Sequence, residues 1–184
     1  LSLSTSVEDD PTRATALINL SRLHRLQHGL QKAETSIDLA LAITGIDSRL
    51  SAEAAYEKAL LELAMNRPET ALEWANKSIA AERGNALGSR LNLAGRIQLV
   101  RGRWSDADAL ARKALVENRS AGQLEEEANS LRIMGIVARN EKNYDGGTQF
   151  LHEALLIDKR IGKSGKIAAD LGELAETARK AGKL

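Results

Sequence analysis

The sequence repeats itself at intervals of 36 to 40 residues. Residues 102–115, GRWSDADALARKAL, and residues 142–155, KNYDGGTQFLHEAL, share an aromatic residue, a small residue three places on, and later an Ala-Leu pair. Weaker copies are anchored at Leu30 and Pro68, where the stronger copies have Trp104 and Tyr144, so the steps are 38, 36 and 40 residues. This interval is typical of a stack of similar units, each packed against its neighbours.

Each unit has the pattern of two antiparallel helices. A small residue stands nine places before each anchor (Ser21, Ala59, Gly95 and Gly135), and another stands three places after it. Glycine lowers helix stability, so we interpret Gly95 and Gly135 as points where paired helices approach closely. Aromatic residues make up only 3% of the chain, which indicates an interior of Ala, Leu and Ile that favours closely packed helices. We expect helices near residues 12–27, 30–43, 51–66, 68–82, 85–101, 104–119, 122–141, 144–161 and 166–181.

This pattern resembles the tetratricopeptide repeat (TPR). The match is carried by Ala94-Gly95, Gly102, Trp104, Ala107, Ala111 and Ala114-Leu115 in one unit, and by Met134-Gly135, Tyr144, Gly147, Leu151 and Ala154-Leu155 in the next. Upstream, Lys58 and Pro68 depart from the leucine and the aromatic residue of the family pattern. The steps exceed the common 34 residues and are similar to those of kinesin light chain repeats. The resemblance implies an all-α fold, an α-solenoid of about four and a half TPR-like hairpins wound into a right-handed superhelix.

The expected organisation is a disordered lead-in over residues 1–10 and a single TPR-like array over residues 11–184. The array would consist of units at about 14–51, 52–87, 88–127 and 128–167, followed by a capping helix at 168–184. In this last helix, Leu171, Leu174, Ala175 and Ala178 share a face that can cover the preceding pair. The helix could instead dock on another copy, so the sequence leaves the oligomeric state open.

Composition restricts the partners and leaves the compartment open. With 26 basic and 25 acidic residues, the net charge of +1 gives no overall field that would attract nucleic acid. No apolar stretch approaches the roughly 18 residues of a membrane span, so we expect no membrane insertion. The absence of cysteine fits the cytoplasm or a cysteine-poor bacterial periplasm or cell envelope. Because the sequence begins at Leu1, a segment removed from upstream, such as a secretory signal, would be consistent with the second location.

Catalytic and metal-binding patterns are weak. His24 and His28 have the spacing of two zinc ligands, but Arg25 lies between them where a metalloprotease has glutamate. GKSGK at residues 162–166 resembles the end of a phosphate-binding loop, yet Ile157 stands where that loop needs its first glycine. No combination of nucleophile, base and orienting group is visible. We therefore expect no enzyme activity, no metal and no cofactor.

By resemblance to TPR proteins, one stripe along the first helix of each pair lines a concave groove. The predicted ligand contacts, which include Asn129 one turn away, are Arg22, Arg25, Tyr56, Asn92, Arg96, Asn129, Arg132, Arg139 and Arg179. On the last helix the stripe begins at Gly172 and also contains Glu176. Arginine suits carboxylates and asparagine suits peptide backbone, so we predict a protein-interaction scaffold that binds an acidic segment or a terminal carboxylate. Two alternatives stay open: the arginines are simply solvated on an exposed face, or the chain is a sensor or regulatory segment of a larger signalling or transcription-regulating protein.

Overall fold

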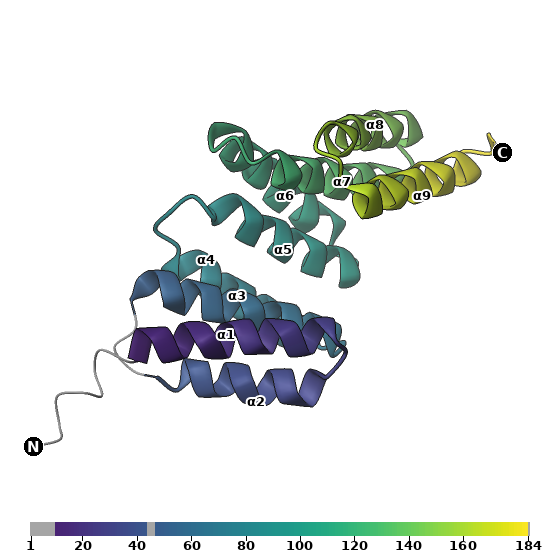
Figure 1. Cartoon of the computed structure of the whole chain (residues 1–184). Coiled ribbons are helices and arrows are strands. Elements are labelled where there is room, and N and C mark those ends of the chain that lie inside the picture. The colour runs from purple at the N-terminus through teal and green to yellow at the C-terminus, as the bar shows by residue number, and fades with distance from the viewer. Residues whose placement is uncertain (1–9, 44–46, 184) are drawn as a thin grey trace, which may run out of the picture. The chain divides into compact units, whose positions relative to one another are not determined.

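The computed structural model describes residues 10–43 and 47–183 (Figure 1). Within these ranges, 83% of the residues lie in helices, and there are nine helices and no strands, which confirms the all-α prediction. The helices are α1 Asp10–Leu26, α2 Leu30–Leu41, α3 Ser48–Ala64, α4 Pro68–Ala81, α5 Leu87–Val100, α6 Trp104–Ser120, α7 Leu124–Asn140, α8 Tyr144–Arg160 and α9 Ser164–Lys180. Asp10 already belongs to α1, and the rest of the expected lead-in lies outside the described residues.

The helices fall into two compact units, one up to Gly84 with α1–α4 and one from Asn85 onward with α5–α9. Each unit is built from the antiparallel pairs that the repeats indicate, and the second unit also contains α9. The single array and its unit boundaries stay a prediction.

Four anchors of the repeat each begin a helix, since α2, α4, α6 and α8 start at Leu30, Pro68, Trp104 and Tyr144. The turn before each anchor has one geometry. The residue two places before the anchor has a left-handed backbone, with φ of 61° at His28, 59° at Asn66, 69° at Gly102 and 65° at Lys142. The amide of the following residue donates to the carbonyl five residues back, as in Gly29 to His24. This arrangement is a Schellman motif, which ends one helix and reverses the chain.

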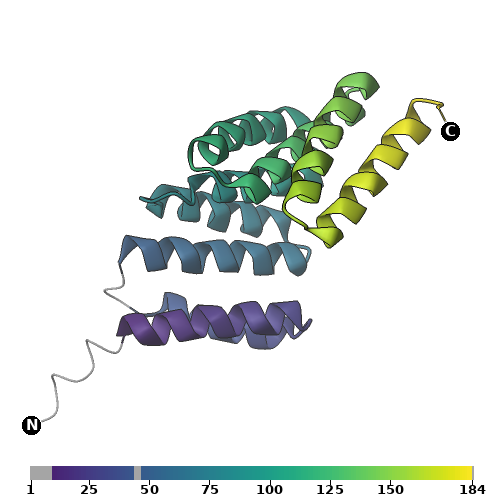
Figure 2. The ribbon, with the colours of Figure 1, turned by 45° about the horizontal axis from the view of Figure 1, so that its top comes forward.

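The first unit has an aliphatic interior. Helix α1 packs on α2 and α3, and α3 packs on α4 (Figure 2). Ile18, Ile37 and Leu61 are buried at its centre together with alanines that are fully inaccessible to solvent. Where α3 meets α4, the Ser78 hydroxyl donates to the carbonyl of Ala52 at 2.7 Å. Small side chains therefore let these helices approach closely, as the composition predicts.

The second unit contains the tightest helix contact proposed from the repeats. A Cβ added at Gly135 would lie 2.7 Å from Leu151 Cγ and 3.2 Å from the carbonyl oxygen of Gly147. Gly135 and Gly147 thus let α7 and α8 approach at backbone distance. A Cβ added at Gly95 would have its nearest contacts at 3.5 Å, which is ordinary packing. Close approach of the paired helices therefore explains Gly135, but it does not require a glycine in place of alanine at Gly95.

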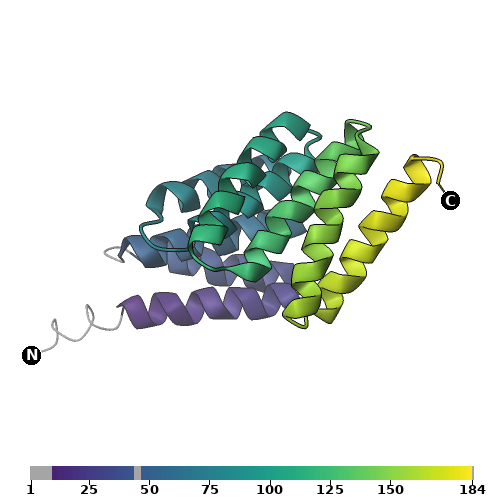
Figure 3. The ribbon, with the colours of Figure 1, turned by 90° about the horizontal axis from the view of Figure 1, so that it is seen from above.

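Helix α9 packs against α8 and α7 (Figure 3). The side chains it buries completely are Asp170 and Thr177, whereas Leu171 is 51% exposed. Leu174 and Ala178 face Thr148 and His152 of α8 across an open cavity of about 430 Å³. The apolar face of α9 is therefore covered only in part. None of the helices in the described ranges combines the length and hydrophobicity needed to cross a membrane.

Candidate binding groove

The predicted arginines of α1 are paired with acids of α3. Arg22 donates to Glu53, and Arg25 donates through Nε to Glu57 at 2.7 Å. Glu57 is fully buried and also lies 3.6 Å from Arg22. Tyr56, on the same helix, is half-buried and also has an interaction partner. These arginines therefore join neighbouring helices, which reduces their capacity to hold a ligand.

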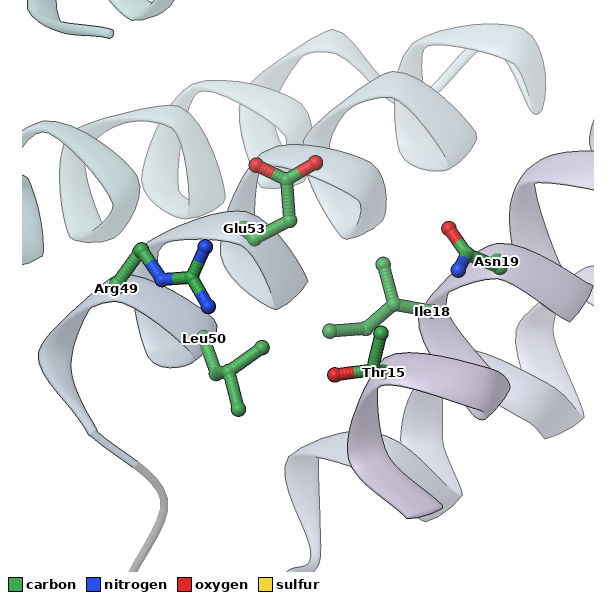
Figure 4. Close-up of a pocket in the computed structure, with 6 residues that line it drawn as sticks. All are labelled: Thr15, Ile18, Asn19, Arg49, Leu50 and Glu53. Carbon is green, nitrogen blue, oxygen red and sulfur yellow. The ribbon is translucent and has the colours of Figure 1, made fainter. Parts of the chain in front are cut away.

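A cavity of about 320 Å³ lies between α1 and α3, close to these ion pairs (Figure 4). Ile18 and Leu50 point into it from the two helices. Arg49 and Glu53 flank it with one charge of each sign, and Thr15 and Asn19 complete it. Because the opposite charges offset one another, the cavity has no net preference for an anion.

Two predicted arginines of the second unit also have acidic partners. Arg139 is 8% exposed, and its guanidinium donates to the carboxylate of Glu173 on α9. Arg179 donates to Glu176 one turn earlier on α9 at 2.7 Å and 2.8 Å. The hydrogen bond to Glu176 raises the pKa of Arg179, and the same bond lowers the pKa of Glu176.

Asn92 belongs to a buried polar triad that links α5, α6 and α7. The hydroxyl of Ser130 donates to Asn92 Oδ1 at 2.8 Å and lies 3.1 Å from the donor Nδ2 of Asn118. Asn118 and Ser130 are fully buried, and Asn92 is 2% exposed. Gly88 makes room for this triad, because a Cβ there would lie 1.9 Å from Asn118 Oδ1. Asn92 therefore has a structural role in this unit.

Forty residues later, the same three positions hold Arg132, Asp158 and Asp170. Arg132 Nε donates to Asp170 at 2.6 Å, and its Nη2 donates to Asp158. Both carboxyl groups are fully buried. The neutral triad of one pair is thus replaced by an ionic triad that joins α7, α8 and α9.

Three cations face one cavity of about 340 Å³ in the second unit, which we call the α5–α7–α9 groove. Its lining consists of Arg96, Leu99 and Val100 from α5, Asn129, Arg132, Ile133 and Ile136 from α7, and Lys166 and Ala169 from α9. Arg96 is exposed, and among the described residues it has no hydrogen-bond or ion-pair partner. Asn129 Oδ1 accepts from Arg132 at 2.7 Å and from Lys166 at 3.0 Å.

The electrostatics of Lys166 reflect this concentration of positive charge. Burial lowers the pKa of its ammonium group, and the charges of Arg132 and Arg96 lower it further, whereas Glu125 and Glu126 oppose the shift. No carboxylate lines the groove within the described part of the chain. An anion placed there would therefore be attracted by all three cations.

Several solved structures share this architecture. The apo form of RapI has a TM-score of 0.78 at 16% identity, over 91% of this chain and 64% of RapI. Kinesin light chain TPR-like repeats from Podosopora anserina reach 0.74 at 16% identity, over 94% of this chain and 88% of that one. YrrB, described as a TPR protein with an unusual peptide-binding site, reaches 0.61 at 17% identity over 100% and 99%. The chain has the TPR-like repeat fold. No protein-family model and no curated protein matches the sequence. The chain spans less than two thirds of the length of RapI.

Within this TPR-like fold, the structure brings together only some of the predicted site residues. Arg96, Asn129 and Arg132 meet in the α5–α7–α9 groove, whereas Asn92 lies in the buried triad. Arg22 and Arg25 lie in the first unit, and Arg139 and Arg179 are bound by acids. The role of all nine as ligand contacts stays a prediction.

Lys166 is the charged groove residue that the sequence analysis missed, and the apolar Val100, Ile133 and Ala169 were missed with it. The predicted stripe on α9 began at Gly172, but steps of three toward the start of the helix reach Ala169 and Lys166, which both line the groove. The TPR-like pattern thus contained the signal. The sequence analysis considered GKSGK as a phosphate-binding loop, although the segment lies in the connection that leads into the last helix. The structure places Gly162 in that connection with φ of 71°, and α9 begins at Ser164.

In the described ranges, no group of three or more His, Cys, Asp or Glu residues is placed to hold a metal ion. His24 lies in the last turn of α1, and His28 forms the left-handed turn that follows it. Both histidines thus belong to a helix end of the TPR-like repeat.

Proposed function

We propose that the protein is an interaction scaffold that binds an acidic peptide segment of a partner in the α5–α7–α9 groove. The observation that carries this proposal is the meeting of Arg96, Arg132 and Lys166 around one cavity whose lining contains no carboxylate. Arginine and lysine at the surface of a partly apolar cavity attract carboxylates and form charge-assisted hydrogen bonds with them. The neighbouring Asn129 can donate to a peptide carbonyl through its amide nitrogen, because its oxygen accepts from the protein itself.

The apolar wall of the groove narrows the class of peptide. Leu99, Ile133 and Ile136 line the cavity beside the cations. A volume of about 340 Å³ gives room for a short stretch of extended peptide. The preferred segment therefore alternates acidic residues with aliphatic ones, so that one side chain fills the apolar part while its neighbours meet the cations.

The lining also supports binding without catalysis. None of its described members is a serine, cysteine, histidine or carboxylate, so Lys166, the amine in the lining, has no second acid or base beside it in the groove. YrrB has the same fold and is described as peptide-binding. A sensor or regulatory segment of a larger protein would use the same groove and stays a prediction.

The proposal is tested by calorimetric titration with an acetylated hexapeptide of alternating leucine and aspartate. Arg96→Ala and Lys166→Ala should each weaken binding about 3- to 10-fold, and added salt should weaken binding to the unmodified protein. Arg132→Ala is a poor probe because it would leave Asp158 and Asp170 without their cation.

Arg112→Ala is the matched control. Its side chain is 59% exposed on α6 and pairs with Asp108, so it removes one positive charge outside the groove. Affinity should stay unchanged in this variant. A double Arg96→Ala/Lys166→Ala variant that binds the peptide as tightly as the unmodified protein would overturn the proposal.

A further inference from the structure

The ionic triad has more acceptors than donors. Arg132 supplies a hydrogen bond to one oxygen of Asp158 and to one oxygen of Asp170. The remaining oxygens, Asp158 Oδ1 and Asp170 Oδ2, are buried, and no donor reaches them. Two ionised carboxylates with unsatisfied oxygens are costly in a site without solvent. One proton placed between the two carboxyl groups would turn one of these acceptors into a donor and satisfy both.

The homologous neutral triad shows what a donor does at this position. In α5–α7, the Ser130 hydroxyl donates to Asn92 while Asn118 Nδ2 serves as the second donor, so the triad supplies its own hydrogens. In the ionic triad only Arg132 brings hydrogens. A proton on Asp158 would supply a second donor, as Asn118 Nδ2 does forty residues earlier, although Asn118 Oδ1 itself has no donor.

The charges around Asp158 favour uptake of this proton only in part. Burial raises the pKa of Asp158, Arg132 on α7 opposes the rise, and the charge of Asp170 on α9 adds to it, together with the hydrogen bond that a protonated Asp158 makes to that carboxyl group. Lys166 on α9 lowers it slightly. In the connection between α8 and α9, Lys163 also faces Asp158, but it is exposed and held by Glu125.

The proton would change the charge that the groove presents. With both carboxyl groups ionised, Asp158 and Asp170 offset Arg132 and Lys166. With one proton bound, the four groups carry one net positive charge. Arg132 and Lys166 line the groove, so this charge lies next to any bound anion. The protonated state is therefore the one that an acidic ligand prefers.

We propose that binding of an acidic segment in the α5–α7–α9 groove is coupled to the uptake of one proton by the Asp158–Asp170 pair. The proton comes from solvent, resides on Asp158 and is donated to Asp170 Oδ2. This inference rests on the proposed function, because it describes how the same groove is regulated. By linkage, acidification tightens binding, and binding in turn favours the protonated pair.

The first experiment follows the pair without any ligand. Carbon-13 NMR of the aspartate carboxyl groups should show one resonance that titrates above the ordinary range and disappears in Asp158→Asn. The asparagine can accept from Arg132 and donate to Asp170, so it imitates the protonated state. A full set of aspartates that titrate normally would overturn the inference even if the peptide binds.

The second experiment titrates the leucine–aspartate hexapeptide in buffers of different ionisation enthalpy between pH 5.5 and pH 7.5. The unmodified protein should take up a proton on binding and should bind roughly 10-fold more tightly at the lower pH. Asp158→Asn should bind tightly at both pH values with no proton uptake. Asp145→Asn is the control, because it removes an acid that is 91% exposed and paired with Lys183 on the same unit.

The outcomes separate the two proposals. Binding without proton uptake, with the same pH dependence in Asp158→Asn, would overturn the coupling and leave the acidic groove intact. Absence of binding at every pH would overturn the proposed function and the coupling with it. A quadruple variant, Ala128→Gly/Arg132→Asn/Asp158→Asn/Asp170→Ser, copies the neutral triad together with the glycine that makes room for it at position 88. It should lose the proton uptake while it keeps the fold.

Discussion

Lys142 adopts a left-handed backbone, with φ of 65°, in the turn between α7 and α8. Its side chain is exposed, so the conformation serves the turn and not a contact of the lysine itself. Glycine reaches this region without the steric cost of a Cβ. We expect Lys142→Gly to raise the free energy of unfolding by roughly 0.5–1 kcal/mol, measured by urea denaturation.

Gly102 provides the reverse test, forty residues earlier in the equivalent turn. It has φ of 69°, and a Cβ added there would meet no atom within 4 Å. Gly102→Lys therefore isolates the backbone strain and should lower stability by about 1 kcal/mol. Effects of the same sign in both variants would show that the left-handed turn is not what matters.

Gly135 is the position in the contact between α7 and α8 that leaves little room for a larger side chain. Gly135→Ala would place a Cβ 2.7 Å from Leu151 Cγ and should cost about 1–3 kcal/mol by overpacking. Gly172→Ala on α9 is the control, because no atom lies within 4 Å of its Cβ and alanine favours the helix by up to about 1 kcal/mol. Thermal melts of the two variants should shift in opposite directions.

At the scale of elements, the ionic triad determines how α8 and α9 associate as the pH changes. The pKa of Asp158 is raised in the folded state, so the folded chain holds a proton that the unfolded chain releases. The contribution of this group is fully present below the ordinary aspartate pKa of about 3.9 and is lost as the pH rises through the raised value.

We expect the free energy of unfolding to depend differently on pH in the unmodified protein and in a variant that lacks this carboxyl group. Asp158→Asn should gain stability relative to the unmodified protein as the pH rises from about 4 toward 7, because it no longer loses a proton in that range. Urea denaturation of both proteins at several pH values measures the difference. Parallel curves would mean that Asp158 titrates as an ordinary carboxyl group.

The helices could be predicted to within a few residues because their boundaries follow local chemistry. Trp104 and Tyr144 lie where a turn has just ended, and the spacing of small residues shows which helices pair.

The groove could be predicted only in part. Arg96 and Arg132 belong to the predicted stripe, and both line the groove. The pattern could not show that Arg22, Arg25 and Arg139 would pair with Glu53, Glu57 and Glu173. Such pairs join helices more than thirty residues apart, and no local rule fixes them.

At the scale of the whole molecule, the net charge does not indicate which charged side chains are accessible to a partner. Basic and acidic residues number 26 and 25, which excludes a strong overall field. Yet acids such as Glu57, Asp158 and Asp170 are fully buried, whereas Arg96 is exposed. Local burial, and not net charge, therefore determines whether a surface of this protein attracts an anion.

Within each unit, a helix packs only against helices one or two positions away in the order of helices along the chain, as α1 does with α3, α5 with α7 and α7 with α9. Folding therefore requires the closure of short chain segments only, and the entropy lost before the first contacts form is small. In stopped-flow or temperature-jump refolding, we expect the main phase within milliseconds, as for other chains of low contact order. A main phase of seconds would indicate that distant segments must meet before either unit can form.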